Sequence, residues 1–233
     1  MVENISQAVI FCAGKGTRLQ AYTGDIPKVL IEVNGKTLLE YKLEMLDGLV
    51  EEVILVVGYM ADKVRDLIGD SYGNLKISYC YQRELLGSGH ALLQAKDMLD
   101  GKFLVLNGDD IYSRADISKL MDLPLAVMGK RVSNPESFGV FKLDLDNNYL
   151  KEIVEKPKEF ISNIANIGVY VFDSKIFDYE LKKSIRGEYE IIDYLTYLIL
   201  DGRNIVVNIV EDFWLPVNDI NQLEEVRRFF DEN

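Results

Sequence analysis

The sequence predicts an α/β fold with a mixed, mainly parallel sheet flanked by helices, and two patterns carry that prediction. Strand-like and helix-like segments alternate over residues 8–106, as they do in right-handed βαβ units. The segment Ala8–Ala13 is apolar throughout, which is typical of a strand buried on both faces of a parallel sheet. After residue 124, short strand-like runs follow one another with little helix between them. We therefore expect a small β-rich lid beside the parallel sheet.

The expected elements follow from the spacing of apolar residues. Runs of β-forming residues predict strands in the first half at 8–13, 53–57, 75–81 and 103–106. Apolar residues at helical spacing predict helices at 36–49, 61–68 and 88–99. In the second half we expect strands at 125–129, 138–143, 150–155, 167–172 and 205–210 and a helix at 188–200. Asp219 and Gln222 have the spacing of a capping box at the start of a final helix.

Composition and charge exclude several classes of protein. The chain has 233 residues, of which 48% are hydrophobic and 27% charged, enough for a domain with a sizeable core. Its formal net charge of −12 argues against binding to nucleic acid or to an anionic membrane. No apolar run approaches the roughly 18 residues of a membrane span, and no basic secretion signal is visible. We therefore expect a cytoplasmic protein in which Cys12 and Cys80 are reduced.

A glycine loop with three cations follows the first strand. Gly14 and Gly16 tolerate positive φ, so successive backbone N–H groups there can close on an anion. Lys15, Arg18 and Lys28 add positive charge within the same stretch. The spacing fits neither a Walker A loop nor a GxGxxG dinucleotide loop, whose third glycine is missing. We predict a binding site for a polyphosphate; the alternative is a glycine turn with incidental surface cations.

The segment Asn-Gly-Asp-Asp at 107–110 directly follows the strand expected at 103–106. Ligands of parallel sheets lie outside the carboxyl ends of the strands, which places the loops at 14–18, 82–89 and 107–110 on one rim. A carboxylate there suits Mg²⁺, which is usually held by one or two carboxylates together with substrate phosphates. Asp109 is the candidate ligand, whereas Asp110 is expected to be a turn or helix-start residue.

The glycine loop, FCAGKGTRL with PKVL at residues 27–30, resembles the signature LAAGxGTRL followed by PK of the sugar-1-phosphate nucleotidyltransferases. Cys12 stands where alanine is usual, and the resemblance extends over about residues 7–230. It implies a GT-A-like (Rossmann-like) fold with one nucleotidyltransferase domain over residues 1–233. It also implies a nucleotide-binding half at about 1–112, and a sugar-binding half with the C-terminal helix at about 113–233. The implied reaction joins a nucleoside triphosphate to a sugar 1-phosphate and releases pyrophosphate.

The resemblance also implies roles for residues on the nucleotide side. It implies catalytic cations at Arg18, Lys28 and Lys15. It implies nucleotide contacts at Ala13, Gly14, Gly16, Thr17, Gln82, Gly87 and Ser88. Gln82 lies in YQRELLGSGHA, which resembles LQxEQLGTGHA, and an amide can both donate to and accept from the edge of uracil or thymine. We discount His90, the single histidine, as a catalyst and expect it to pack or cap.

A second metal ligand is expected near the carboxyl end of the chain. Many family members carry an aspartate in WxDxG, but here Trp214 is followed by Pro216 at that place. The segment 217–223 instead resembles GVNxRxQL of the N-acetylglucosamine-1-phosphate uridylyltransferases. The resemblance therefore implies that Asn218 and Asp109 hold Mg²⁺, the implied cofactor.

Three motifs after residue 137 resemble the sugar side of the same family. FGV, EKP and NIG stand in the order of the family's YGV, EKP and NxG elements. They imply sugar-phosphate contacts at Gly139, Glu155, Lys156 and Asn166. Residues 188–193 resemble GEYxxTD, with Ile192 where threonine is usual, which puts a hydroxyl contact there in doubt.

The sequence favours UTP or dTTP as the nucleotide, with CTP and a phosphorylated alcohol or polyol as the alternative. A GT-A glycosyltransferase would be expected to carry a DxD pair, and an inactive nucleotide-sensing subunit would be expected to lose the cations. The acetyltransferase repeats usual in the uridylyltransferase branch are not present in these 233 residues, so we expect no acetyl transfer. The expected partners are small-molecule substrates, without nucleic acid or membrane, and the chain could form a homo-oligomer.

Overall fold

The computed structural model describes residues 4–16, 19, 24, 26–144 and 148–232. Thr17 and Arg18, for which the sequence predicts nucleotide and phosphate contacts, lie outside the described residues.

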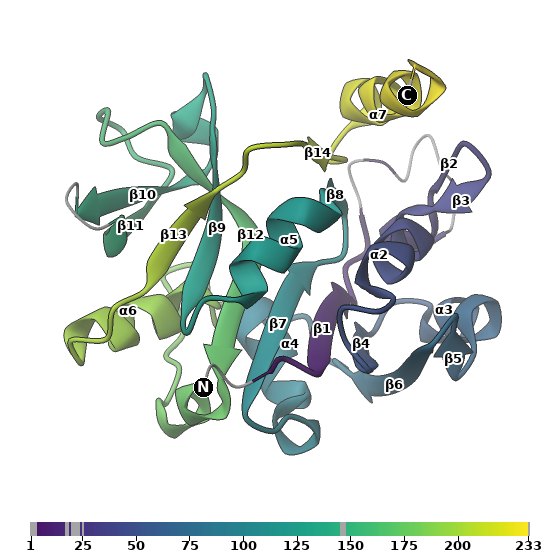
Figure 1. Cartoon of the computed structure of the whole chain (residues 1–233), viewed down its shortest axis with the longest axis horizontal. Helices are drawn as coiled ribbons and strands as arrows, with labels where there is room; N and C mark the ends of the chain where they lie inside the picture. The colour runs from purple at the N-terminus through teal and green to yellow at the C-terminus, as the bar shows by residue number, and fades with distance from the viewer. Residues whose placement is uncertain (1–3, 17–18, 20–23, 25, 145–147, 233) are drawn as a thin grey trace.

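A ten-stranded sheet runs through the molecule (Figure 1). Its strands lie in the order β10 (Gly139–Asp144), β11 (Tyr149–Glu155), β13 (Val206–Ile209), β9 (Ala126–Arg131), β12 (Ile164–Asp173), β7 (Lys102–Asn107), β1 (Gln7–Cys12), β4 (Glu52–Val57), β6 (Leu75–Tyr81) and β5 (Ser71–Tyr72). The α/β fold expected from the sequence is confirmed, and the β-rich part continues the same sheet.

The central strands of this sheet are parallel. β1 lies between β4 and β7 and is parallel to both, and β6 is parallel to β4. The chain runs outward from β1 to β4 and β6, and then returns to β7 on the other side of β1. The strand order therefore reverses between β1 and β7, which is where open α/β sheets bind ligands outside the carboxyl ends of their strands.

The remaining strands are joined mostly in antiparallel fashion. β12 is antiparallel to both β7 and β9, while β13 runs parallel to β9. β10 and β11 form an antiparallel hairpin. One register pair, Val140 with Ala165, joins β10 to β12, and another, Tyr149 with Val206, joins β11 to β13.

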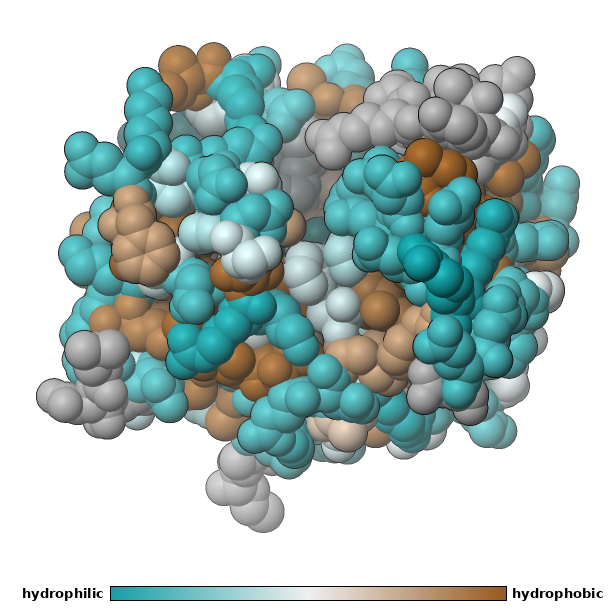
Figure 2. Space-filling view, turned by 90° about the horizontal axis from the view of Figure 1, so that it is seen from above, coloured by the Kyte–Doolittle hydropathy of each residue, from teal (hydrophilic) through white to brown (hydrophobic). Residues whose placement is uncertain are grey.

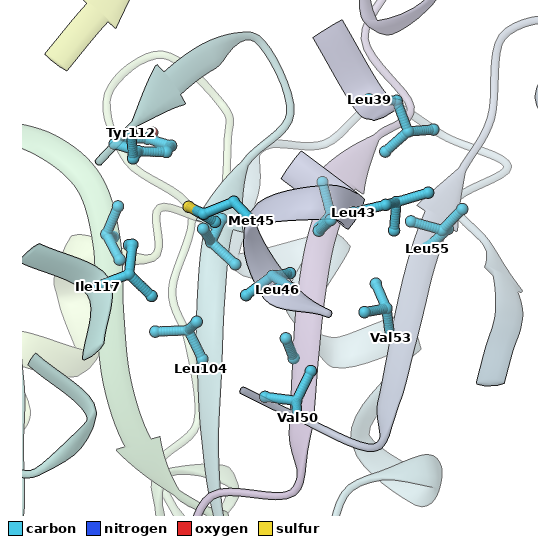
Figure 3. Close-up of a cluster of buried hydrophobic side chains, with 14 of the residues drawn as sticks. Leu39, Leu43, Met45, Leu46, Val50, Val53, Leu55, Leu104, Tyr112 and Ile117 are labelled. Carbon is cyan, nitrogen blue, oxygen red and sulfur yellow. The ribbon is translucent and has the colours of Figure 1, made fainter. Parts of the chain in front are cut away.

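Helices cover both faces of the sheet, because its central strands are apolar on both sides. The helices are α2 (Leu38–Leu46), α3 (Ala61–Ile68), α4 (Ser88–Gln94), α5 (Arg114–Met121), α6 (Ile192–Leu200) and α7 (Ile220–Glu232). Alternate residues of β1, β4 and β7 face α2, α3 and α5, and the residues between them face α4 and α6. Figure 3 shows Leu43 and Leu46 of α2 in front of the sheet, between the strand that carries Leu104 and the strand that carries Val53.

A third apolar cluster fixes the C-terminal helix near the rim. Leu223 and Val226 of α7 pack with Leu19, which follows the glycine loop, and with residues of α2 and of two short ribbons. These ribbons are β2 (Glu32–Val33) with β3 (Lys36–Thr37), and β8 (Asp110–Tyr112) with β14 (Trp214–Pro216). In Figure 1, β8, β14 and α7 lie together at the upper edge.

Several boundaries differ from the expected ones for local reasons. The helix expected at 36–49 begins at Leu38, because Thr37 and Glu40 form a capping box. The helix expected at 188–200 begins at Ile192, because residues just before it bond to the α4 region, with Tyr189 O accepting from Gly89 N. The Asp219 carboxylate caps α7 by accepting from Gln222 N at 3.0 Å. α5 and the β8–β14 ribbon were not expected.

Both cysteines are free and buried, as expected of reduced thiols. Burial raises the pKa of Cys12 to about 12 and the pKa of Cys80 to about 11, so both remain as unreactive thiols at neutral pH. Within the described ranges, no helix has the length and hydrophobicity needed to cross a membrane.

Two buried tyrosines allow a test of the core. The Tyr112 hydroxyl donates to Ile167 O at 2.8 Å, whereas the buried Tyr194 hydroxyl has no hydrogen-bond partner among the described residues. We expect Tyr112→Phe to lower the free energy of unfolding by about 1–3 kcal/mol, because it leaves a buried acceptor unpaired. Tyr194→Phe should leave it unchanged or raise it. Urea unfolding of both variants measures this, and equal destabilisation would contradict the assignment.

Candidate active site

A pocket of about 460 Å³ opens at the carboxyl ends of β1 and β7. Among its lining residues are nine for which the sequence predicts a role: Ala13, Gly14, Gly16, Lys28, Gln82, Gly87, Ser88, Asp109 and Asn218. Figure 2 is seen from the side on which this pocket opens, and it shows a hollow in the surface between the left and right halves of the view. The reversal of strand order therefore brings the three predicted rim loops to one cavity, together with the segment before α7.

The glycine loop approaches Lys28 so closely that a side chain at Gly16 would not fit. Gly16 has φ +61°, and a Cβ at this position would lie 2.7 Å from Lys28 Cβ. Gly108 is equally constrained, because a Cβ there would lie 2.0 Å from Phe11 O. Both positions therefore require glycine for the backbone of the two loops to pass so close to their neighbours.

The two described cations of this region, Lys28 and Lys15, differ in their position relative to the pocket. Lys28 lines the pocket, and its side chain is 12% exposed. The Lys15 ammonium lies 5.9 Å from the ring centroid of Tyr59, in the loop after β4, and Lys15 does not line the pocket in the described structure. The predicted contact of Arg18 falls outside the described residues.

Lys28 joins the two residues predicted to hold a metal ion. Its Nζ donates to Asp109 Oδ2 at 2.6 Å and to Asn218 Oδ1 at 3.2 Å. Asp109 follows β7 and Asn218 precedes α7, so three distant segments of the chain meet at one ammonium group. The two oxygens face one positive charge already, which shows that the donor set suits a cation.

A carboxylate oxygen and an amide oxygen are also ligands that Mg²⁺ accepts. Within the described part of the chain, no three His, Cys, Asp or Glu side chains gather into a group that could hold a metal ion. Asp109 and Asn218 would thus supply two protein oxygens and leave the other positions to water or to phosphate.

The interpretation of Asp110 as a turn or helix-start residue is wrong. Asp110 begins the strand β8, is 5% exposed, and its Oδ2 accepts from Trp214 Nε1 at 3.0 Å. Burial and the neighbouring Asp109 raise the pKa of its carboxyl to about 7, although the Trp214 hydrogen bond and Lys42 oppose this. The pairing of β8 with β14 explains the burial, because Asp110 lies in register with Pro216. β8 has only three residues and pairs with a segment about half the chain away. No pattern in the neighbouring sequence could therefore have predicted it.

Lys42 lies on α2 beneath this site and was also missed. It is 1% exposed, and its Nζ donates to Leu38 O at 3.4 Å. Burial lowers the pKa of Lys42 to about 8, although the carboxylates of Asp110 and Asp109 oppose this decrease. From the sequence alone, a lysine within a helix is expected to face solvent. Only the tertiary structure reveals that Lys42 is buried.

Gln82 is held at the end of β6 in a fixed orientation. The residue is 4% exposed and lines the pocket, and its Nε2 donates to Gly87 O at 3.0 Å. The same nitrogen lies 3.1 Å from Nδ1 of His90, the third residue of α4. Ser88 Oγ accepts from Ile191 N at 3.0 Å, which ties the start of α4 to the segment before α6.

The four residues predicted to bind the sugar phosphate do not line this pocket in the described structure. Gly139 and Glu155 lie together, because a Cβ at Gly139 would be 2.8 Å from Glu155 Oε2. Asn166 Nδ2 donates to the Tyr170 hydroxyl at 2.8 Å, so its side chain is already used in β12. Lys156 has φ +46°, an uncommon conformation for lysine. Their roles remain predictions.

Two contacts connect these residues to the pocket. Gly168, two residues after Asn166, has φ +77°, and a Cβ there would lie 1.9 Å from Asn107 Nδ2. The Arg186 guanidinium lies 3.8 Å from Glu155 Oε1 and 2.9 Å from Glu190 Oε1, in the same segment as the pocket residue Glu188. The predicted sugar side therefore adjoins the cavity.

The buried carboxyl of Asp110 predicts a pH dependence of stability. Its pKa in the folded state, about 7, lies above the ordinary value of 3.8, so the folded state binds the proton more tightly than the unfolded state. The contribution of Asp110 to stability should therefore fall as pH rises from about 4 to about 7. We expect Asp110→Asn to flatten this part of the curve of unfolding free energy against pH, relative to the wild type. Asp66→Asn, an exposed control on α3, should keep the wild-type slope; equal curves for all three proteins would contradict the assignment.

Comparisons with known proteins place the chain in a family. The sequence model of the nucleotidyl transferase family matches residues 7–233. The bifunctional protein GlmU of Methanococcus maripaludis is 42% identical over 200 residues, covering 84% of this chain and 47% of the relative. The UTP–glucose-1-phosphate uridylyltransferase AglF of Haloferax volcanii is 36% identical over 209 residues, covering 85% of this chain and 86% of the relative. The chain spans about half the length of the GlmU relatives that it matches.

Solved structures agree with this placement. A putative glucose-1-phosphate thymidylyltransferase from Bacillus anthracis superposes with a TM-score of 0.85 at 27% identity, covering 96% of this chain and 94% of that chain. A UDP-glucose pyrophosphorylase solved with UDP-glucose superposes with a TM-score of 0.87 at 23% identity, covering 98% and 99%, and this likeness concerns the fold. On its sequence match and its fold, the chain belongs to the nucleotidyl transferase family.

Proposed function

We propose that this protein transfers the uridylyl group of UTP to a sugar 1-phosphate and releases pyrophosphate, with Mg²⁺ as its cofactor. The observation that carries the proposal is the meeting of Lys28, Asp109 and Asn218 below the glycine loop, in the same pocket as Gln82. A glycine loop, a cation, two oxygens for a metal and one amide suit a nucleoside triphosphate.

The chemistry needs no nucleophile or general base from the protein. An oxygen of the sugar phosphate attacks the α-phosphorus of UTP and forms a new P–O bond. The bond from that phosphorus to the bridging oxygen breaks, and its electron pair leaves with pyrophosphate. Because the second pKa of a phosphate monoester is near 6, the attacking group is already an anion near pH 7. Positioning and neutralisation of charge then supply most of the rate enhancement.

Each residue of the site has its own proposed role in this reaction. Lys28 would hold the attacking phosphate beside the α-phosphate, and Lys15 and Arg18 would hold the triphosphate and the leaving pyrophosphate. Lys156 would approach the sugar phosphate from the β11 side. Mg²⁺, when bound by Asp109 and Asn218, would supply charge neutralisation to the phosphates. Glycine at positions 16 and 108 lets the two loops pass close to Lys28 and to Phe11 O at the rim of the pocket.

UTP and two sugars are favoured by different observations. The name of the Haloferax relative specifies UTP and glucose 1-phosphate. The segment 217–223 resembles the N-acetylglucosamine-1-phosphate branch instead, which suggests the N-acetylated sugar. The thymidylyltransferase among the similar structures keeps dTTP as the alternative nucleotide.

Release of pyrophosphate tests the proposal directly. UTP, dTTP, CTP, ATP and GTP are each mixed with glucose 1-phosphate or N-acetylglucosamine 1-phosphate in the presence of Mg²⁺. We expect release with UTP and at least one of these sugars. Asp109→Asn and Arg18→Ala should each lower turnover by about two orders of magnitude or more, because the first removes a carboxylate ligand of Mg²⁺ and the second removes a cation at the phosphates. Asp66→Asn serves as the matched control with wild-type turnover. Binding of UTP without pyrophosphate release from any pair would contradict the proposed activity.

The contact of Lys28 with the predicted metal ligands gives an independent prediction. The ammonium group competes with a metal ion for the oxygens of Asp109 and Asn218. We therefore expect Lys28→Met to tighten Mn²⁺ binding to the nucleotide-free protein by about tenfold, which corresponds to about 1.4 kcal/mol. Titration followed by the electron paramagnetic resonance of free Mn²⁺ measures it. Lys15→Met makes the same change of charge away from these oxygens, and an equal effect in both variants would contradict the competition.

A further inference from the structure

The geometry points to His90 as a positioning residue that determines which pyrimidine the site accepts. His90 holds the side-chain amide of Gln82 so that only its oxygen is available to the pocket. The nucleotide must then offer a hydrogen-bond donor at that point, which uracil and thymine do and the ring nitrogen N3 of cytosine does not. This inference rests on the proposed function for the placement of the base beside Gln82.

The backbone of Gly87 decides which end of the Gln82 amide is nitrogen. Gly87 O, at 3.0 Å from the amide nitrogen, is a carbonyl oxygen and can only accept. It also accepts from Ala91 N at 3.1 Å in the first turn of α4, so its position is fixed by the helix. The opposite amide orientation would place two acceptors against each other. One of the two side-chain N–H groups of Gln82 therefore donates to Gly87 O.

His90 engages the second N–H of the same amide. Its Nδ1 lies 3.1 Å from Gln82 Nε2, and its Nε2 lies 3.3 Å from Gln94 Nε2. A neutral imidazole accepts at one nitrogen only. Gln82 is buried, whereas Gln94 is half-buried and already donates to His90 O at 3.1 Å. Because an unpaired buried donor costs more than an accessible one, Nδ1 accepts from Gln82.

The surroundings fix the main chain of Gln82 and the ring of His90. The backbone N of Gln82 donates to Val57 O at 2.8 Å, and a Cβ at Gly58 would lie 2.9 Å from Gln82 O. The His90 ring is stacked on Tyr189, with ring centroids 6.2 Å apart. Both side chains of the pair are thus held from the strand, the helix and the segment before α6. With both N–H groups engaged, Oε1 is the polar atom that Gln82 offers to a ligand.

The donor patterns of the bases then set the selectivity. Uracil and thymine carry N3–H, which can donate to Gln82 Oε1. Cytosine has a lone pair on N3, which would face the oxygen as a second acceptor. A site that offers a fixed acceptor therefore rejects cytosine more strongly than a site whose amide can turn over, because the fixed group is left unpaired.

The test measures the dissociation constants of UTP and CTP by calorimetry in the presence of Mg²⁺. The wild type should bind UTP more tightly. In His90→Leu only Gly87 O still opposes the turned amide, and the second N–H loses its acceptor. The amide can then turn more readily toward N3 of cytosine, so the ratio of the CTP constant to the UTP constant should fall by about tenfold. In His90→Asn the side-chain oxygen can replace Nδ1 as acceptor, and the ratio should stay near that of the wild type. Thermal unfolding of each variant shows whether it is folded.

Gln94→Leu is the matched control, since it removes the polar side chain beside Nε2 of the ring and should preserve the ratio. An unchanged ratio in folded His90→Leu overturns the role of His90 while leaving the proposed function intact. An equal loss of selectivity in folded His90→Asn and His90→Leu also overturns it. A wild type that does not prefer UTP overturns both. A wild type that releases no pyrophosphate, while its binding ratio falls in His90→Leu, supports the role of His90 and contradicts the proposed activity.

Discussion

The position of β1 between β4 and β7 is the constraint on which the rest of the structure depends. This strand is apolar on both faces and parallel to both neighbours, so it cannot lie at an edge of the sheet. Because the chain leaves β1 in one direction and returns to β7 on the other side, the glycine loop and the turn at 107–110 emerge next to each other. Gly108 illustrates how close they come, since its backbone approaches Phe11 O at the end of β1. The pocket is a consequence of strand order and does not need a separate domain to form it.

The second determinant is the local charge within an acidic chain. The formal net charge is −12, yet the pocket contains the ammonium of Lys28 held by Asp109 and Asn218. Below it lies a second layer of charge in which Lys42 and Asp110 are both almost fully buried. Trp214 connects this layer to the segment that leads to Asn218. A phosphate ligand would therefore be attracted by a few positively charged groups at the pocket, although the molecule as a whole carries a negative charge.

Local pattern was enough to predict most of the fold. The bounds of α3 and β6 agree with the expected ranges, because both are short segments with clear periodicity. α5 was missed, since only Asp116, Ile117 and Leu120 of its eight residues are buried and its apolar pattern is weak. In the pocket, motifs located Lys28, Gln82 and Asn218. They could not reveal that Asp110 is a buried strand residue or that Lys42 lies beneath it, because both depend on pairing between distant segments.

The attachment of the β10–β11 hairpin limits where the molecule can close over a ligand. β12 is held to β7 by five successive register pairs, from Val169–Leu106 to Asp173–Lys102. A hinge between the parallel and antiparallel parts would have to break this ladder. The hairpin has register pairs at Val140 and at Tyr149, and Leu150 N also donates to Ile205 O at 2.8 Å while Val207 N donates to Asn148 O at 2.9 Å. Because Phe141 and Leu150 of the hairpin are also buried in the apolar core, Gly139 and Glu155 are held by the same framework as the nucleotide side.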